Sequence, residues 1–204
     1  MDIKNYLNTY VEQARKEGSS ATNPEWMRKF FCEFAEGVEK RIKQASKGDR
    51  YIVTKPFAGA FHYLLPPGVT WNIEQSLSNY LDVSESGSVL ANMLKKKRVD
   101  ISVEREPISL LIEFKTNLTF NDLSAAIAEM ALVKASKHKG KIRTGALQLY
   151  PAAWGIDALS ELNRIMGAPL DAIWVLCRKT KSSFEFDLPA IESMRTDIER
   201  LVSP

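Results

Sequence analysis

The chain has 204 residues, of which 45% are hydrophobic and 26% are charged. This composition is typical of one globular domain with a sizeable core, alone or with a small appendage, and it excludes a disordered or fibrous protein. No run approaches about 18 uninterrupted apolar residues, and the N-terminus lacks the basic-then-apolar pattern of a signal peptide. The sequence therefore predicts a soluble, cytoplasmic protein with no membrane partner. A net charge of +3 is too small to indicate nucleic-acid binding by itself.

The two cysteines do not indicate a cross-linked or metal-bound framework. Cys32 and Cys177 lie far apart and neither belongs to a CxxC pair, so a disulfide scaffold and a thiolate zinc site are both unsupported. We expect both to be reduced core residues. The chain also contains no GxSxG, P-loop or GxGxxG motif.

The first 70 residues carry the weakest pattern. Residues 24–46 place Trp26, Phe30 and Phe34 at steps of four, which indicates one amphipathic helix, and residues 3–16 indicate a weaker helix before it. Residues 47–71 contain Gly and Pro too often for a long helix. We therefore expect residues 1–70 to form a helical and irregular extension and residues 71–204 to form the core domain.

The patterns become clearer from residue 72. Residues 72–82 have Ile73, Leu77 and Leu81 at helical spacing, and Asn72 is suited to the N-cap, so a helix is expected there. Residues 86–94 are interpreted as a possible strand. Residues 98–104 alternate apolar and polar positions, and residues 108–115 form a β-rich run of the kind found inside a sheet.

The rest of the chain alternates between helix and strand. The sequence predicts a helix over 121–137, a strand over 144–154, a helix over 155–167, a strand over 170–179, an edge strand over 182–188 and a helix over 189–201. This order predicts a mixed α/β sheet flanked by helices.

Three charges interrupt the two strands over 98–104 and 108–115. Side chains alternate between the faces of a strand, so Glu113 and Lys115 project from the same face. If the two strands pair antiparallel through the turn between them, Asp100 comes close to Glu113. Burying an unpaired charge costs several kcal/mol or more, so these charges require a partner, solvent or a metal. A cross-strand salt bridge between Asp100 and Lys115 is the alternative without a function.

Two neighbouring carboxylates favour a hard divalent cation. Asp100 and Glu113 would repel each other, and Mg²⁺, which prefers oxygen ligands, would relieve that repulsion. The ammonium of Lys115 would then lie beside whatever the metal binds, where it suits a phosphate or a water that loses its proton. This combination of groups is suited to phosphodiester hydrolysis.

The same residues resemble the motif of the PD-(D/E)xK nuclease superfamily. Asp100 is followed by twelve residues and then by Glu113-Phe114-Lys115, although Val99 stands where the motif has proline. The resemblance implies a restriction-endonuclease-like α-β-β-β-α-β core over about residues 70–178. It also implies that Asp100, Glu113 and the carbonyl of Phe114 bind Mg²⁺, with Mn²⁺ as a possible substitute, and that Lys115 activates the attacking water.

Glu74 has a weaker claim to the same site. Many members of the superfamily have a further acidic residue in the helix before the strands, and Glu74 is similar in placement. The resemblance therefore implies that Glu74 is a ligand of a second metal or a group that orients water. An acid in the first turn of a helix also stabilises that helix through its dipole, so both interpretations stay open. Glu129, Asp122 and Gln148 are secondary candidates, and for the two acids an exposed helix surface is the favoured interpretation.

Two basic clusters lie near these strands in the sequence. They comprise Lys95, Lys96, Lys97 and Arg98, and Lys137, Lys139, Lys141 and Arg143. A solvated surface is the ordinary interpretation of each. In a nuclease, however, Lys and Arg contacts to phosphates supply most of the non-specific affinity, so we expect both clusters to bind nucleic acid.

The sequence therefore predicts a Mg²⁺-dependent nuclease, with DNA favoured over RNA as its partner and a homodimer as one possible assembly. A second hypothesis is a nucleic-acid-binding or assembly protein that retains the nuclease fold but has weak or no catalysis. A third is an α/β protein whose charges are purely structural, which would be supported if Lys115 were paired and shut away from solvent.

Overall fold

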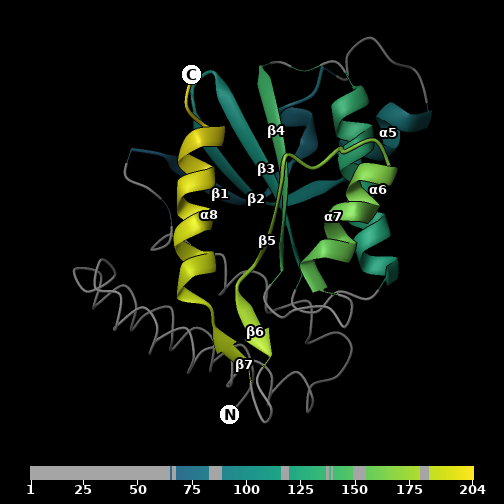
Figure 1. The fold of residues 1–204 in the computed structure, drawn as a ribbon. Helices are drawn as coiled ribbons and strands as arrows, with labels where there is room; N and C mark the ends of the chain where they lie inside the picture. Colours follow the sequence, from purple (N-terminus) through teal and green to yellow (C-terminus); the bar gives the residue numbers. More distant parts are fainter. Residues whose placement is uncertain are drawn as a thin grey trace, which may run out of the picture.

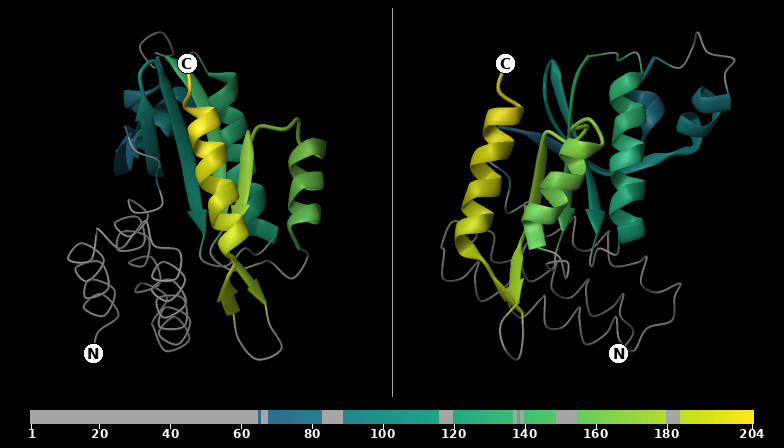
Figure 2. Two further views of the ribbon diagram at one scale, coloured as in Figure 1. Left: turned by 60° about the vertical axis from the view of Figure 1, so that its left-hand side comes forward. Right: turned by 45° about the vertical axis from the view of Figure 1, so that its right-hand side comes forward.

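The computed structural model describes residues 65, 68–82, 89–115, 120–136, 138, 140–148, 155–179 and 184–204. Within them the chain forms a five-stranded sheet in the order β1-β2-β3-β4-β5 and a separate two-stranded sheet of β6 and β7. Helix α8 lies on one face of the large sheet, and α6 and α7 lie on the other (Figures 1 and 2). The predicted mixed α/β fold is confirmed. The predicted extension over residues 1–70 falls almost wholly outside the described residues, and its predicted boundary at residue 70 coincides with the start of β1.

The first three strands form an antiparallel meander. They are β1 (Thr70–Ser76), β2 (Arg98–Arg105) and β3 (Ile108–Lys115). The register of β2 and β3 pairs Ile101 with Ile112 and Arg105 with Ile108, which places the turn at Glu106 and Pro107. Apolar side chains of both strands are fully buried, so this hairpin forms the centre of the core.

The helix expected over residues 72–82 was wrong. Residues 70–76 are strand β1, which pairs with β2, and only Leu77–Asn79 form a short 3₁₀ turn, η4. Asn72 therefore does not cap a helix; the N-cap of η4 is Ser76, whose hydroxyl accepts from the backbone N–H of Ser78. The spacing of Leu77 and Leu81 reflects burial around this turn, and pairing with β2 outweighs the helical spacing over 70–76.

The strand suggested over residues 86–94 was also wrong. Helix α5 runs over Val89–Lys96 and leads directly into β2. Leu94 is buried against Leu77 and Leu111, whereas Met93 is 56% exposed. One buried side of a short helix explains why its apolar run resembled a strand.

The remaining elements follow the predicted order. They are α6 (Phe120–Ala135), β4 (Lys141–Gln148), α7 (Gly155–Ile165), β5 (Ala172–Val175), β6 (Cys177–Lys179), β7 (Phe184–Phe186) and α8 (Leu188–Leu201). Strands β3, β4 and β5 are parallel, so their carboxyl ends meet at one edge. The segment predicted as one strand over 170–179 divides into β5 and β6. Cys177 is a buried, reduced cysteine, as expected, while Cys32 is outside the described residues.

Two apolar clusters attach the helices to one face of the sheet. Leu111 and Ile142 from the sheet pack with Val133 of α6 and Leu94 of α5. Farther along the same face, Ala146 packs with Ile127 and Met130 of α6 and with Leu159 of α7. This face is therefore covered over most of its length, and a site on it must lie at an end of the strands. Among the described residues, no helix is long and apolar enough to cross a membrane.

Candidate active site

Asp100 and Glu113 meet at the open end of the β2–β3 hairpin. The register that pairs Ile101 with Ile112 puts Asp100 opposite Glu113, which confirms the expected approach. The Oδ2 atom of Asp100 accepts a hydrogen bond of 2.9 Å from the backbone N–H of Phe114. The N–H of Phe114 lies beyond the last backbone pair described for β2 and β3. Its hydrogen bond to the Asp100 carboxylate therefore holds the Asp100 side chain beside β3.

Lys115 lies between the two carboxylates. Its Nζ atom donates to Glu113 Oε2 at 3.0 Å and is 3.8 Å from Asp100 Oδ2. The side chains are 30% exposed for Lys115, 25% for Asp100 and 7% for Glu113. The cross-strand ion pair exists, but Lys115 is not shut away from solvent. The condition stated for purely structural charges is therefore met only in part.

The pKa values of Asp100, Glu113 and Lys115 are shifted because the two carboxyl groups lie close together and are partly removed from solvent. Burial and, next, the charge of Asp100 together raise the pKa of Glu113 to about 8, against the opposing effect of Lys115. Burial also raises the pKa of Asp100, although Lys115 and the N–H of Phe114 lower it. Burial alone would lower the pKa of Lys115, but Glu113 and Asp100 outweigh it and raise the pKa. The ammonium is thus charged, and with a Glu113 pKa of about 8 the carboxyl pair of the metal-free protein retains a proton at neutral pH.

The donor set suits a hard divalent cation. The carboxylates of Asp100 and Glu113, both within 4 Å of the Lys115 ammonium, provide the oxygen ligands that Mg²⁺ prefers, and Mg²⁺ commonly uses only one or two carboxylates and keeps several waters. Within the described residues no three Asp, Glu, His or Cys side chains form a metal-ligand group. Asp100 and Glu113 would therefore hold the ion, with the Phe114 carbonyl as the third oxygen that the family resemblance implies.

Helix α6 adds an acid that the sequence had assigned to an exposed surface. Glu129 lies in a hollow of about 210 Å³ lined also by Glu113, Lys115 and the two alanines of α6 at positions 125 and 126. Its charge raises the pKa of both Glu113 and Asp100. The interpretation of Glu129 as exposed helix surface was wrong. Small residues three and four positions before an acid, on one stripe of a helix, are the signal that could have identified it.

The first basic cluster borders the same hollow. Lys97 Nζ donates to Glu129 Oε2 at 2.9 Å, and Arg98 Nη1 lies 3.6 Å from Glu74 Oε2. Lys97 and Arg98 line the hollow beside Glu113 and Lys115, whereas Lys95 and Lys96 are exposed in the last turn of α5.

Glu74 is not in the expected helix. It is a residue of β1 with a positive φ of 50°, opposite Asp100 in the register that pairs Ile73 with Ile101. Its carboxylate pairs with Arg98. The interpretation of Glu74 as an acid that stabilises a helix through its dipole is therefore wrong. The role of Glu74 toward a metal stays a prediction.

The structure does not bring the second basic cluster to this site. Lys141 and Arg143 pair with Ile108 and Leu110 of β3, at the end of the sheet opposite Lys115 and on the other face. Lys137 and Lys139 are outside the described residues, as is the side chain of Asp122. The second basic cluster follows Lys115 in the sequence after only one helix, α6, and this proximity suggested a shared site. That helix, however, returns the chain to the end of the sheet opposite Lys115, where β4 begins.

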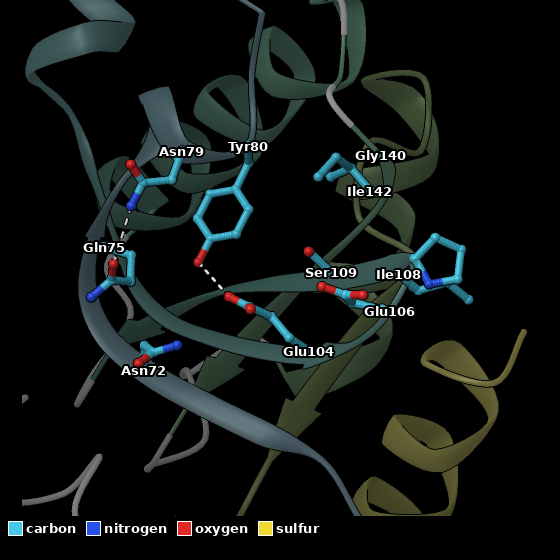
Figure 3. A pocket seen from close by; sticks show the side chains of 11 residues that line it. Asn72, Gln75, Asn79, Tyr80, Glu104, Glu106, Ile108, Ser109, Gly140 and Ile142 are labelled. Carbon is cyan, nitrogen blue, oxygen red and sulfur yellow. Dashed lines mark hydrogen bonds between the residues drawn. The ribbon is translucent and has the colours of Figure 1, made fainter.

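A larger hollow of about 500 Å³ lies at that far end (Figure 3). Tyr80 donates to Glu104 Oε1 at 2.7 Å on one side of it, and burial raises the pKa of this tyrosine. Glu104 and Glu106 line it together with the amides of Asn72 and Gln75. Its size exceeds that of the hollow at Lys115, but a lining with two acids and no lysine or arginine disfavours a polyanion. The smaller hollow is the better candidate for nucleic-acid chemistry.

Gln148 is brought to the site by strand pairing. As the last residue of β4 it pairs in register with Lys115, and its side chain is 1% exposed. This secondary candidate thus lies one strand away from the lysine on the same face. Neither of its amide atoms has a hydrogen-bond partner among the described residues.

Comparison with known proteins adds a fold relative. No family model and no curated protein matches the sequence. The solved structure of NucC from P. aeruginosa ATCC27853, in its cAAA-bound form, is similar to this chain with a TM-score of 0.50 and 10% sequence identity. The match covers 98% of this chain and 92% of the NucC chain. At this identity the similarity concerns the fold alone. The chain has a mixed α/β fold, a five-stranded central sheet flanked by helices, that is consistent with a restriction-endonuclease-like fold.

Proposed function

We propose that this chain hydrolyses phosphodiester bonds in nucleic acid, with DNA as its substrate and Mg²⁺ as its metal. The observation that carries the proposal is the meeting of Asp100, Glu113 and Lys115 at the open end of the β2–β3 hairpin, with the lysine 3.0 and 3.8 Å from the two carboxylates. The nuclease-like fold supports it. The solvent access of Lys115 also supports it, because a reacting group must be reached by its substrate.

Each residue has a role that follows from its position. Asp100 and Glu113 would hold the cation, and the Phe114 N–H fixes the Asp100 carboxylate in place. When bound, Mg²⁺ supplies positive charge that attracts phosphate oxygens and makes a nearby water more acidic. The Lys115 ammonium, a partly exposed donor at the same point, orients the attacking water and stabilises charge on the phosphate. Lys97 and Arg98 at the rim attract the neighbouring phosphates.

The test is cleavage of linear duplex DNA with Mg²⁺, with Mn²⁺ and with EDTA. Asp100→Asn and Lys115→Met keep side-chain size and should each lower the cleavage rate by at least about a hundredfold, the loss typical of removing a charged group that acts in the transition state. Glu106→Gln is the matched control, because this glutamate is exposed in the turn at the other end of the hairpin. Wild-type rates in Asp100→Asn or Lys115→Met, with all variants folded, would refute the mechanism.

The same experiment separates the proposal from the alternative of a binding or assembly protein. Two ion pairs, Lys97 with Glu129 and Arg98 with Glu74, border the hollow, and both lie next to the reacting residues. If the wild type binds duplex DNA and Mn²⁺ but cleaves no nucleic acid, DNA or RNA, the alternative is correct. Cleavage of RNA alone would retain the nuclease and correct its substrate.

A further inference from the structure

A buried amide next to the site lacks the hydrogen bonds that its burial demands. Gln148 is 1% exposed, and neither its Oε1 nor its Nε2 atom has a partner among the described residues. Nearly all buried polar side-chain atoms in proteins are hydrogen-bonded, because leaving one unpaired costs free energy. Its backbone carbonyl, by comparison, is paired, since it accepts from the N–H of Leu176 at 3.0 Å. The side chain therefore requires an explanation.

The position of Gln148 relates it to Lys115. The two residues are paired in the parallel register of β3 and β4, and each is the last residue of its strand. Neighbouring strands lie about 4.8 Å apart, and residues in register project from the same face. Two residues back along β4, on the same face, Ala146 belongs to the apolar cluster under α6. Gln148 thus occupies the boundary between that cluster and the charged group of Asp100, Glu113 and Lys115.

The present partners of Lys115 are the same oxygens that would bind a cation. Its Nζ atom contacts Glu113 Oε2 at 3.0 Å and Asp100 Oδ2 at 3.8 Å. A divalent ion bound to these two carboxylates would repel the Lys115 ammonium and would neutralise the negative charge that attracts this ammonium in the metal-free protein. The lysine has three N–H donors and no acceptor, so it then needs another acceptor within reach. The unpaired Oε1 atom of Gln148, one strand away on the same face, supplies one.

We infer that Gln148 is a positioning residue for Lys115, whose ammonium donates a hydrogen bond to the Gln148 amide oxygen when Asp100 and Glu113 bind a divalent cation. The inference rests on the proposed function for the identity of the cation site. It accounts for the Oε1 acceptor left unpaired in the metal-free protein, because this acceptor is used in the bound state. Gln148 contacts neither metal nor substrate in this account and acts only through Lys115.

The first test compares metal-free stability with metal affinity. Gln148→Met, with Gln148→Leu as a second variant, removes the amide while keeping an unbranched or similarly sized apolar side chain. The melting temperature in EDTA should rise, because an unpaired buried amide is lost. The dissociation constant for Mn²⁺, measured by calorimetry, should increase about tenfold to a hundredfold, as for other groups that orient the surroundings of a metal site. Gln148→Glu, which keeps an acceptor oxygen, should restore part of the affinity.

A matched control separates this role from a packing effect. Asn163 is a half-buried amide whose Nδ2 and Oδ1 atoms both bond the backbone of Leu170 at 3.0 Å. Asn163→Leu should lower the melting temperature and leave the Mn²⁺ affinity unchanged. If Gln148→Met lowers the melting temperature and leaves the Mn²⁺ affinity unchanged in the same way, Gln148 has a structural role and the inference is wrong.

A double-mutant cycle tests the dependence on Lys115 without using activity. In a Lys115→Met background no ammonium remains to be held, so Gln148→Met should no longer change the Mn²⁺ affinity. An undiminished effect in that background would overturn the inference. A wild type that binds no Mn²⁺ would overturn it together with the proposed site. A wild type that binds Mn²⁺ and shows this coupling but cleaves no nucleic acid would refute the proposed function and leave the inference standing.

Discussion

Glu113→Gln should change how the stability of the metal-free protein depends on pH. The pKa of Glu113 rises from an ordinary value of 4.5 to about 8 in the folded protein. Between these values the folded state binds more protons than the unfolded state, so the free energy of unfolding falls as pH rises from about 4.5 to about 8. Glutamine resembles the neutral carboxyl group and carries no such pH dependence.

The size of the effect follows from the pKa. At about 1.4 kcal/mol per pH unit, the change in the Glu113 pKa corresponds to at most about 5 kcal/mol. The pKa of Asp100 is also raised, so the two carboxyl groups share the proton that the folded protein takes up. We therefore expect about half of this free energy, or about 2–3 kcal/mol, for the Glu113 carboxyl alone. For a chain of this size that is a difference in melting temperature of about 5–10 °C.

The assay is thermal unfolding in EDTA over a range of pH. Glu113→Gln and the wild type should melt together near about pH 5, and the variant should become progressively more stable than the wild type up to about pH 9. Glu106→Gln, at an exposed turn position, should follow the wild-type curve. Added Mg²⁺ should stabilise the wild type more at high pH and should not stabilise Glu113→Gln, because the metal requires the deprotonated carboxylate. Parallel curves for Glu113→Gln and wild type would refute the burial and repulsion argument.

Three further outcomes are expected. Arg98→Ala should weaken DNA binding and reduce the slope of log affinity against log salt by about 1, measured by fluorescence anisotropy at several salt concentrations, whereas Lys141→Ala at the far end of the sheet should have a smaller effect. Gly145→Ala should lower stability by about 1–3 kcal/mol in denaturant titrations, because an added Cβ would lie 2.7 Å from the Trp174 ring; an unchanged midpoint would contradict that packing. Thr144→Val should cost about 1–3 kcal/mol in the same assay, because its buried hydroxyl donates to the Pro169 carbonyl.

The sequence alone determined the central trio of the site. Strand periodicity places Glu113 and Lys115 on one face, and a short turn gives the hairpin a register that brings Asp100 opposite Glu113. These relations are local, since they involve residues at most 15 positions apart and one turn. The order of helices and strands after residue 98 was predictable for the same reason, because each element carries its own periodicity.

Only the tertiary structure decided which other residues surround that trio. Glu129 faces the site because α6 packs on this face of the sheet and lines the hollow beside Glu113 and Lys115, and Gln148 lies beside Lys115 because β4 pairs with β3 in one particular parallel register. Residues 70–76 form a strand because β2 offers its edge, against the helical spacing of their own apolar residues. Lys141 and Arg143 lie far from Lys115 although they are close to it in sequence. In each case the outcome depends on hydrogen bonds and packing between distant segments, and the pattern of a single segment carries no information about them.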